Sequence, residues 1–378
     1  MVSPEMLMRL SRGFGGRRLK VWGINLMRRA GLRYLVVRMD TTNLCNLRCR
    51  MCYISAEQPR RREQMDLELF DKIARQAFRR TRLLFLSCAT EPLMNRDFGT
   101  FLEHTGRYRI PFTCFVTNGM LLNEDVVRRA LAARISEIRF SVDGATKETY
   151  EFIRRGADWE TLLEKLHLLR RVKREAGSGL PAGRLVFTCL ERNIRELPQL
   201  VRLAAEYGIA SVQVRHLLTF GVAGAGLDWQ EQLRYRSVFN EVAQAAAAEA
   251  PRLGVKLILP QPISPATPAR KSGRREANPH CLIPWSQVII SPSGLVRLCS
   301  HFPPLGDLRK QSLADIFNGP EINRIRKALL RRSPDSCSWA CAQEAFDAPD
   351  EQPEATEESS HHAKSASPGP NGGTETPP

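Results

Sequence analysis

Short hydrophobic runs alternate with amphipathic segments between residues 35 and 214. Six of the runs have the length of buried strands, at residues 35–39, 83–87, 112–116, 138–142, 185–190 and 212–214. The intervening segments carry apolar residues at helical spacing, at residues 67–78, 125–133, 161–171 and 194–207. Strands that alternate with helices in this way build parallel sheets with both faces covered. The pattern therefore predicts an α/β fold, a partial (β/α)6 TIM-like barrel.

The same pattern divides the chain into four regions. A basic N-terminal extension occupies residues 1–34, and the strand–helix core occupies residues 35–230. Residues 231–345 contain a helical stretch, a Pro-rich basic connector and a small cysteine-bearing domain. Residues 346–378 are rich in Pro, Glu, Ser, Gly and Thr and have almost no large apolar side chains, so we expect a disordered tail there.

The chain is strongly basic, with a formal net charge of +16 at pH 7. Lysine and arginine are frequent in its first 40 residues, which suits contact with an anionic membrane or an acidic partner. The alternative is a solvated helix that packs on the body of the protein. No pattern of basic and aromatic residues for base stacking occurs, so no nucleic-acid partner is expected. The sequence shows no apolar run of 18 residues and no secretory signal, which predicts a cytoplasmic protein.

Three of the ten cysteines lie close together, directly after the first predicted strand. Cys45, Cys49 and Cys52 are separated by three and by two residues. Cysteine thiolates hold iron–sulfur clusters, and three ligands on a four-iron cluster leave one iron open for another molecule. Zinc is the alternative, but a structural zinc ion uses four ligands, and no fourth cysteine or histidine lies nearby. The spacing favours a cluster.

Unusual polar segments stand at the ends of the next three predicted strands. They are residues 88–92 after the second strand, 117–119 after the third and 141–144 at the end of the fourth. The carboxyl ends of parallel strands meet on one rim, where the chemistry of such folds takes place. We therefore expect these segments to lie beside the three cysteines.

The spacing CxxxCxxC resembles the signature of the radical S-adenosylmethionine (SAM) superfamily, and the downstream motifs follow in the same order. The resemblance covers roughly residues 35–215. It implies that the cysteines hold a [4Fe-4S] cluster whose open iron binds SAM, with an electron donor such as flavodoxin or ferredoxin. One-electron cleavage of SAM would then yield a 5′-deoxyadenosyl radical, which removes a hydrogen atom from the substrate.

The resemblance also implies which residues surround SAM. Glu91 and the backbone of Thr90 resemble the end of the strand-2 motif that holds the SAM amino group, although Cys88-Ala89-Thr90 stands where glycines are usual. Arg154 resembles the arginine that meets the SAM carboxylate. Met51 fills a position that is often aromatic in the family, and its apolar side chain would pack on adenine. The segments after the third and fourth strands supply the other implied cofactor-binding residues, Asn118, Ser141 and Asp143.

Four further cysteines lie after residue 280. They are Cys281, Cys299, Cys337 and Cys341, and a turn at residues 291–294 predicts a hairpin between the first two. Four thiolates can fully ligate one [4Fe-4S] cluster or one zinc ion. This region resembles the twitch domain, a shortened relative of the SPASM domain. The resemblance implies a single auxiliary [4Fe-4S] cluster that transfers electrons.

Three cysteines remain, in or beside predicted strands: Cys88, Cys114 and Cys189. A buried free cysteine usually acts as a small hydrophobic residue. By resemblance to radical SAM epimerases, one of them would instead donate a hydrogen atom to a substrate radical. Cys88 is the catalytic candidate because it lies closest to the SAM motif. His216, just past the sixth strand, is either a substrate contact or a core histidine.

Several functions are consistent with these motifs. The first hypothesis is oxidation of a C–H or alcohol carbon in a small polar metabolite, such as a sugar or an aminocyclitol. The alternatives are a radical epimerase with a cysteine hydrogen donor and a maturase of ribosomally made peptides. The maturase ranks lower, because such enzymes often carry a peptide-recognition domain before the core and only about 34 residues precede the first strand. An iron–sulfur electron carrier ranks last, because it would have no use for Glu91, Ser141 or Arg154.

Overall fold

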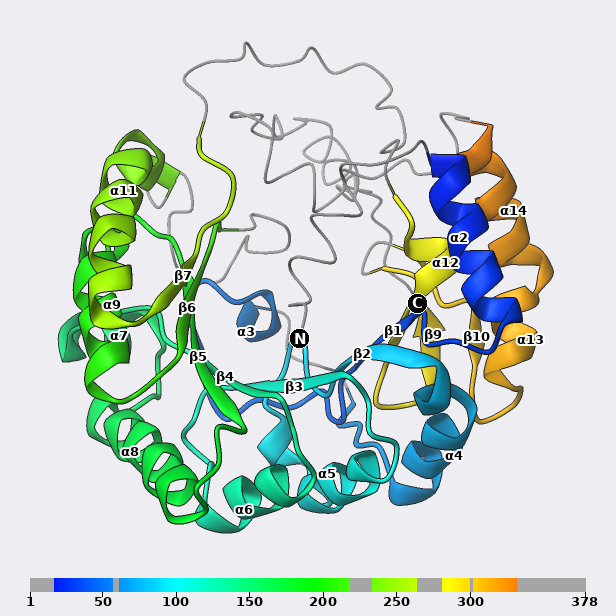
Figure 1. Ribbon diagram of the computed structural model, residues 1–378, viewed down its shortest axis with the longest axis horizontal. Coiled ribbons are helices and arrows are strands. Elements are labelled where there is room, and N and C mark those ends of the chain that lie inside the picture. Colours follow the sequence, from blue (N-terminus) through cyan, green and yellow to red (C-terminus); the bar gives the residue numbers. More distant parts are fainter. Residues whose placement is uncertain (1–16, 57–60, 218–232, 264–280, 300–301, 332–378) are drawn as a thin grey trace, which may run out of the picture.

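The computed structural model describes residues 17–56, 61–217, 233–263, 281–299 and 302–331. Within these residues one sheet of ten strands forms an open arc, with helices along its outer side (Figure 1). The order of neighbouring strands is β10-β9-β8-β1-β2-β3-β4-β5-β6-β7. The strands are β1 Leu35–Met39, β2 Thr81–Phe85, β3 Phe112–Thr117, β4 Glu137–Ser141, β5 Ala182–Thr188, β6 Ser211–Arg215, β7 Lys256–Ile258, β8 Gln287–Ile290, β9 Leu295–Arg297 and β10 Gly306–Asp307.

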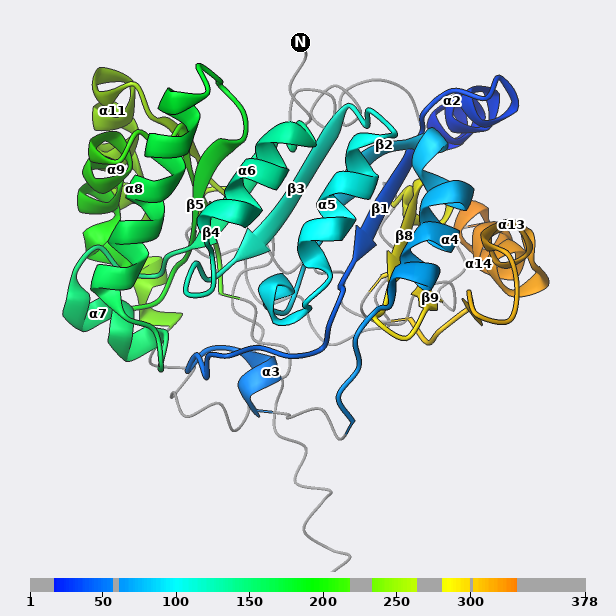
Figure 2. The same cartoon turned by 90° about the horizontal axis from the view of Figure 1, so that it is seen from below.

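Helices cover the convex side of the arc from one end to the other (Figures 1 and 2). The α-helices are α2 Arg17–Arg29, α3 Tyr53–Ala56, α4 Leu67–Ala77, α5 Phe98–Gly106, α6 Glu124–Ala132, α7 Lys147–Ile153, α8 Trp159–Glu175, α9 Leu197–Glu206, α11 Phe239–Glu249, α12 Ile283–Ser286, α13 Leu313–Asn318 and α14 Pro320–Leu330. The 3-10 helices are η1 Phe78–Arg80, η2 Pro92–Met94, η3 Ile194–Glu196, η4 Leu233–Ser237 and η5 Ala250–Leu253.

The predicted partial barrel is confirmed, and the structure extends it at both edges. Strands β1 to β7 pair in parallel, each with the next. The seventh, β7, was not among the six predicted strands. At the other edge β8 pairs in parallel with β1, and β9 and β10 continue the sheet in antiparallel fashion. The C-terminal cysteine-bearing region therefore shares a sheet with the core.

Local sequence explains where the outer helices begin and which face they bury. Asp66, Asn123 and Asp158 each accept a hydrogen bond from the backbone N–H three residues later, which caps α4, α6 and α8. Apolar residues at helical spacing, such as Leu69 and Ile73 of α4, then turn one face of each helix toward the sheet.

Alternate residues of the parallel strands face opposite sides of the sheet. On β4, Ile138 and Phe140 have no exposed surface and belong to the hydrophobic core. Glu137 and Arg139 of the same strand line a cavity. Because successive side chains of a strand point to opposite faces, the concave side of the arc receives the polar residues.

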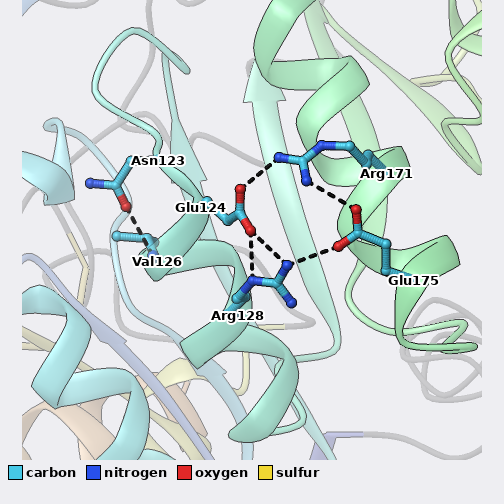
Figure 3. Close-up of polar contacts among 6 residues, drawn as sticks. All are labelled: Asn123, Glu124, Val126, Arg128, Arg171 and Glu175. Atoms are coloured by element: carbon cyan, nitrogen blue, oxygen red, sulfur yellow. Dashed lines mark hydrogen bonds and ion pairs between the residues drawn. The ribbon is translucent and has the colours of Figure 1, made fainter.

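A ring of exposed charges joins α6 to α8 (Figure 3). Arg128 pairs with Glu124 and Glu175 at 2.6 and 2.8 Å. Arg171 pairs with the same two carboxylates at 2.6 and 3.0 Å. Solvent and salt screen such exposed pairs, so we expect the ring to orient the two helices and to contribute little to stability.

Part of the basic N-terminal extension forms α2, which packs against the C-terminal region. Val21 is buried, and Arg28 Nη1 donates a hydrogen bond to Asn318 Oδ1 at 2.9 Å. The expected disordered tail, residues 346–378, lies outside the described residues. None of the helices described is both long and apolar enough to cross a membrane.

Candidate active site

The loop that follows β1 carries the first three cysteines and is fixed by backbone hydrogen bonds. The N–H of Arg48 donates to the carbonyl of Arg155, and the N–H of Arg50 donates to the carbonyl of Ile153. The Cys52 N–H donates to the Cys49 carbonyl at 3.2 Å, which closes a turn between two of the cysteines. These contacts attach the cysteine loop to the C-terminal end of α7, beyond the fourth strand.

The three thiols lie in surroundings that suit a metal cluster. Burial raises the pKa of Cys49 to about 12 and also raises the pKa of Cys45. Thiolates at these positions therefore need a nearby positive charge, which cluster iron provides. A protein cation also lies close by, since Arg154 Nη1 is 3.9 Å from Cys49 Sγ.

Arg154 is held in a buried ion pair beside the cysteine loop. Its Nη2 lies 2.5 Å from Asp143 Oδ2, and Asp143 has no exposed surface. Asp143 Oδ1 also accepts the Thr188 N–H at 2.7 Å. Within the described residues Arg154 Nε is buried without a hydrogen-bond partner. That N–H is available to a carboxylate of a bound molecule, which fits the role implied for Arg154.

A close backbone contact beside this pair requires glycine. A Cβ built on Gly144 would lie 2.6 Å from the backbone nitrogen of Tyr150 and 2.9 Å from its Cα. Neither atom belongs to a flexible side chain, so a larger residue would displace the start of α7. Gly144 therefore lets α7 approach β4 closely enough for Arg154 to reach Asp143.

Glu91 forms the second part of the site. Its carboxylate accepts hydrogen bonds from Thr117 Oγ1 at 2.8 Å and from the Asn118 N–H at 2.7 Å. Gly119 then turns the chain with φ at +88°, a conformation that favours glycine. The Asn118 side chain reaches back to Asn46 at 2.8 Å and to Cys45 Sγ at 3.9 Å. The motif after β3 thus joins Glu91 to the cysteine loop.

The buried Glu91 gives a pH-dependent stability. Burial raises its pKa from 4.5 to about 7, so the folded state binds the proton more tightly than the unfolded chain does. The stability due to this proton is full below pH 4.5 and is lost as pH rises to about 7. At 1.36 kcal/mol per pKa unit the loss is about 3 kcal/mol. Between pH 4 and 8, the unfolding free energy of the SAM-free wild type should fall by about 3 kcal/mol more than that of Glu91→Gln. Denaturant unfolding measures this difference. Equal pH dependence of the two proteins would refute the assignment.

Asp40, which the sequence analysis did not single out, organises the loop after β2. Its Oδ1 accepts the N–H groups of Cys88 and Ala89 at 2.8 and 3.0 Å. Thr90 is fixed by its own hydroxyl, which donates to the Thr42 carbonyl at 2.6 Å, and its carbonyl accepts the Ser87 hydroxyl at 2.8 Å. A carbonyl has two lone pairs, so the Thr90 carbonyl keeps one acceptor position for the predicted contact with SAM. An acidic residue directly after a buried strand was the available signal for Asp40.

The other predicted residues occupy different environments. Ser141 ends β4 and is half-buried, as is Met51, which packs against the core. Cys114 and Cys189 are fully buried. His216 is also buried, with Nδ1 3.0 Å from the Tyr235 hydroxyl and Nε2 3.1 Å from the Gln261 carbonyl oxygen. These contacts are typical of a core histidine.

The two described cysteines of the second set lie at the opposite ends of the strands from the first set. Cys281 precedes β8 and Cys299 follows β9, so the predicted hairpin brings both to its open end. Because β8 runs parallel to β1, that end lies at the start of β1, whereas Cys45 follows the end of β1. The five residues of β1 set its two ends roughly 15 Å apart. Cys337 and Cys341 lie outside the described residues.

Two family models match the chain. One describes the radical SAM superfamily and covers residues 39–185, and the other describes an iron–sulfur cluster-binding domain, SPASM, and covers residues 281–342. The first range includes the cysteine loop, Glu91 and Arg154. The chain belongs to the radical SAM superfamily. Its cofactors are accordingly SAM and a [4Fe-4S] cluster, with an auxiliary iron–sulfur cluster in the SPASM-like region.

Curated relatives align with most of the chain. The PqqA peptide cyclase of Xanthomonas campestris pv. campestris (strain 8004) is 24% identical over 304 residues, which cover 77% of this chain and 76% of that protein. The antilisterial bacteriocin subtilosin biosynthesis protein AlbA of Bacillus subtilis (strain 168) is 22% identical over 304 residues, with 79% and 62% covered.

Solved structures support the radical SAM fold. Streptococcus suis SuiB bound to S-adenosylmethionine has a TM-score of 0.62 at 13% identity, and the match covers 86% of this chain and 77% of that one. The protein anSMEcpe with bound AdoMet and Cp18Cys peptide has a TM-score of 0.56, with 77% and 81% covered. At 13% identity these likenesses bear on the fold alone.

Proposed function

We propose that this radical SAM enzyme modifies a peptide. The main support is that two curated relatives, a PqqA peptide cyclase and a subtilosin biosynthesis protein, each align with more than three quarters of the chain. This favours the maturase alternative over oxidation of a small polar metabolite.

The residues of the rim serve this function by positioning. When bound, the cofactors supply hydrogen-atom abstraction by a 5′-deoxyadenosyl radical and an electron acceptor in the auxiliary region. Asn118 joins the Glu91 carboxyl group to the cysteine loop, and Arg154 contacts the loop directly, so the two side chains suit the amino and carboxylate groups of an amino acid. Asp40 holds the β2 loop so that Cys88 faces the concave side.

The test uses reconstituted enzyme, SAM, dithionite and synthetic peptides. The peptides represent the short reading frames that flank the gene. We expect one of them to increase 5′-deoxyadenosine formation and to be recovered lighter by two hydrogen atoms. Stimulation by sugars or aminocyclitols, with no change in any peptide, would contradict the proposal.

Cys88 favours epimerisation as a second candidate, because its side chain is accessible from the concave cavity. Cys88 lines the concave cavity, and burial within those walls raises its pKa to about 12. The side chain therefore stays a neutral thiol, the form that can donate a hydrogen atom. For an epimerase, a peptide turned over in heavy water gains one deuterium, and Cys88→Ala abolishes that gain while 5′-deoxyadenosine is still released. Cys114→Ala is the matched control. Full epimerisation by Cys88→Ala would exclude Cys88 as the donor.

A further inference from the structure

The concave side of the arc encloses a cavity of about 340 Å³ whose walls are unusually basic. Its lining includes Cys88 and Lys256, the first residue of β7. Cys88 lies at the carboxyl ends of the parallel strands, where the cysteine loop also lies, and we call this end of the barrel the SAM rim. Five cationic side chains from five different strands line it, and Glu137 is the single carboxylate in its lining. The cations are Arg38, Arg139, Arg184, Arg215 and Lys256.

Glu137, the single carboxylate of the lining, already pairs with two of the arginines. Glu137 Oε2 accepts Arg139 Nε at 2.9 Å, and Glu137 Oε1 pairs with Arg184. Both oxygens of the carboxylate therefore face guanidinium groups. The lining has no second acidic side chain. The carboxylate of Asp40, which interacts electrostatically with Arg38, already accepts the N–H groups of Cys88 and Ala89.

Arg215 and Arg38 stand at the end of the cavity that is closer to the SAM rim. Arg215 is the last residue of β6, and its Nη2 lies 3.4 Å from Gln213 Oε1. Burial lowers the pKa of Arg215 to about 10, and the positive charges of Arg139 and Arg38 add to this effect. Arg38 lies over the Phe85 ring at 4.5 Å, and Arg139 lies over the same ring at 5.4 Å. Like charges gathered in a buried space are unfavourable unless an anion joins them.

We propose that this cavity binds an acidic side chain of the substrate peptide, with Arg215 and Arg38 as its carboxylate partners. The proposal rests on the proposed function and assigns the class of residue that enters the barrel. Guanidinium groups pair with carboxylates through two parallel hydrogen bonds, which fixes orientation as well as charge. A volume of about 340 Å³ accepts a side chain or two and leaves the main chain at the rim, beside Cys88.

The test measures binding of two blocked tripeptides to the reconstituted full chain by calorimetry. Ac-Ala-Glu-Ala-NH2 should bind, its affinity should fall with added salt, and the glutamine analogue should bind at least tenfold more weakly. Arg215→Gln should weaken the glutamyl peptide at least tenfold, whereas Arg215→Lys should weaken it only a few fold. Arg252→Gln, an exposed position on η5, is the matched control and should bind as the wild type does. Unfolding midpoints would show that each variant is folded.

Equal binding of the two tripeptides would overturn the inference, as would wild-type affinity in Arg215→Gln. Tighter binding of inorganic phosphate than of the glutamyl peptide would overturn the assignment to a carboxylate. The two proposals fail separately. If the glutamyl peptide binds but no peptide is ever modified, the cavity chemistry stands and the proposed function falls. If a peptide without acidic residues is modified at full rate, the function stands and this inference falls.

Discussion

Replacing Cys49 with serine is expected to abolish SAM cleavage and to lower the iron content by about four atoms per chain. Cys49 is 7% exposed and lies in the loop that carries Cys45 and Cys52. Serine has nearly the same size, but its hydroxyl is a poor ligand for cluster iron, so two thiolates alone would hold the cluster. Iron and sulfide analysis after anaerobic reconstitution, followed by assay of 5′-deoxyadenosine, measures both effects.

Cys114→Ala is the control for this experiment. Cys114 is fully buried on β3 and belongs to neither cysteine set. The variant should keep the iron content and the rate of SAM cleavage of the wild type. If Cys49→Ser kept both properties, the cysteine loop could not be the cluster site.

Arg154→Gln is expected to cost about 3–5 kcal/mol of unfolding free energy and to abolish SAM cleavage. The substitution leaves Asp143, which has no exposed surface, as a buried charge without its cation. The double variant Asp143→Asn, Arg154→Gln removes both charges and should recover most of the lost stability. It should not recover SAM cleavage, because the guanidinium that faces the cysteine loop is still missing. Denaturant unfolding and the 5′-deoxyadenosine assay separate the two effects.

Arg202→Gln is the matched control for Arg154. Arg202 pairs with Glu249 at 2.6 Å, but its side chain is 58% exposed, so solvent screens the interaction. Its loss should change stability far less than the loss of Arg154, and activity should be retained. A double variant of Asp143 and Arg154 that cleaves SAM at the wild-type rate would show that Arg154 acts only in folding.

The sequence alone determined the strand–helix alternation, the cysteine spacing and the rim on which the chemistry lies. These features depend on local periodicity and on a general property of parallel sheets, whose carboxyl ends meet at one edge. The relation of Cys45 to Glu91 and Asn118 could be predicted for that reason. The family matches agree with this assignment.

Only the tertiary structure decided which partners these residues have. Asp143 is predicted from the sequence as a cofactor-binding residue, and the structure shows that its carboxylate pairs with Arg154. Asp40 holds a loop that begins 48 residues further along the chain. No local pattern encodes such contacts, because they depend on how separate strands pair.

The basic cavity is the clearest example of this limit. Each of its arginines stands in a different strand and looks in the sequence like an isolated charge in an apolar run. Closing the sheet into an arc turns these alternate positions toward one another, and only then do single charges become a binding surface. The strand pattern fixed which face each side chain takes, and the curvature of the sheet decided which side chains meet.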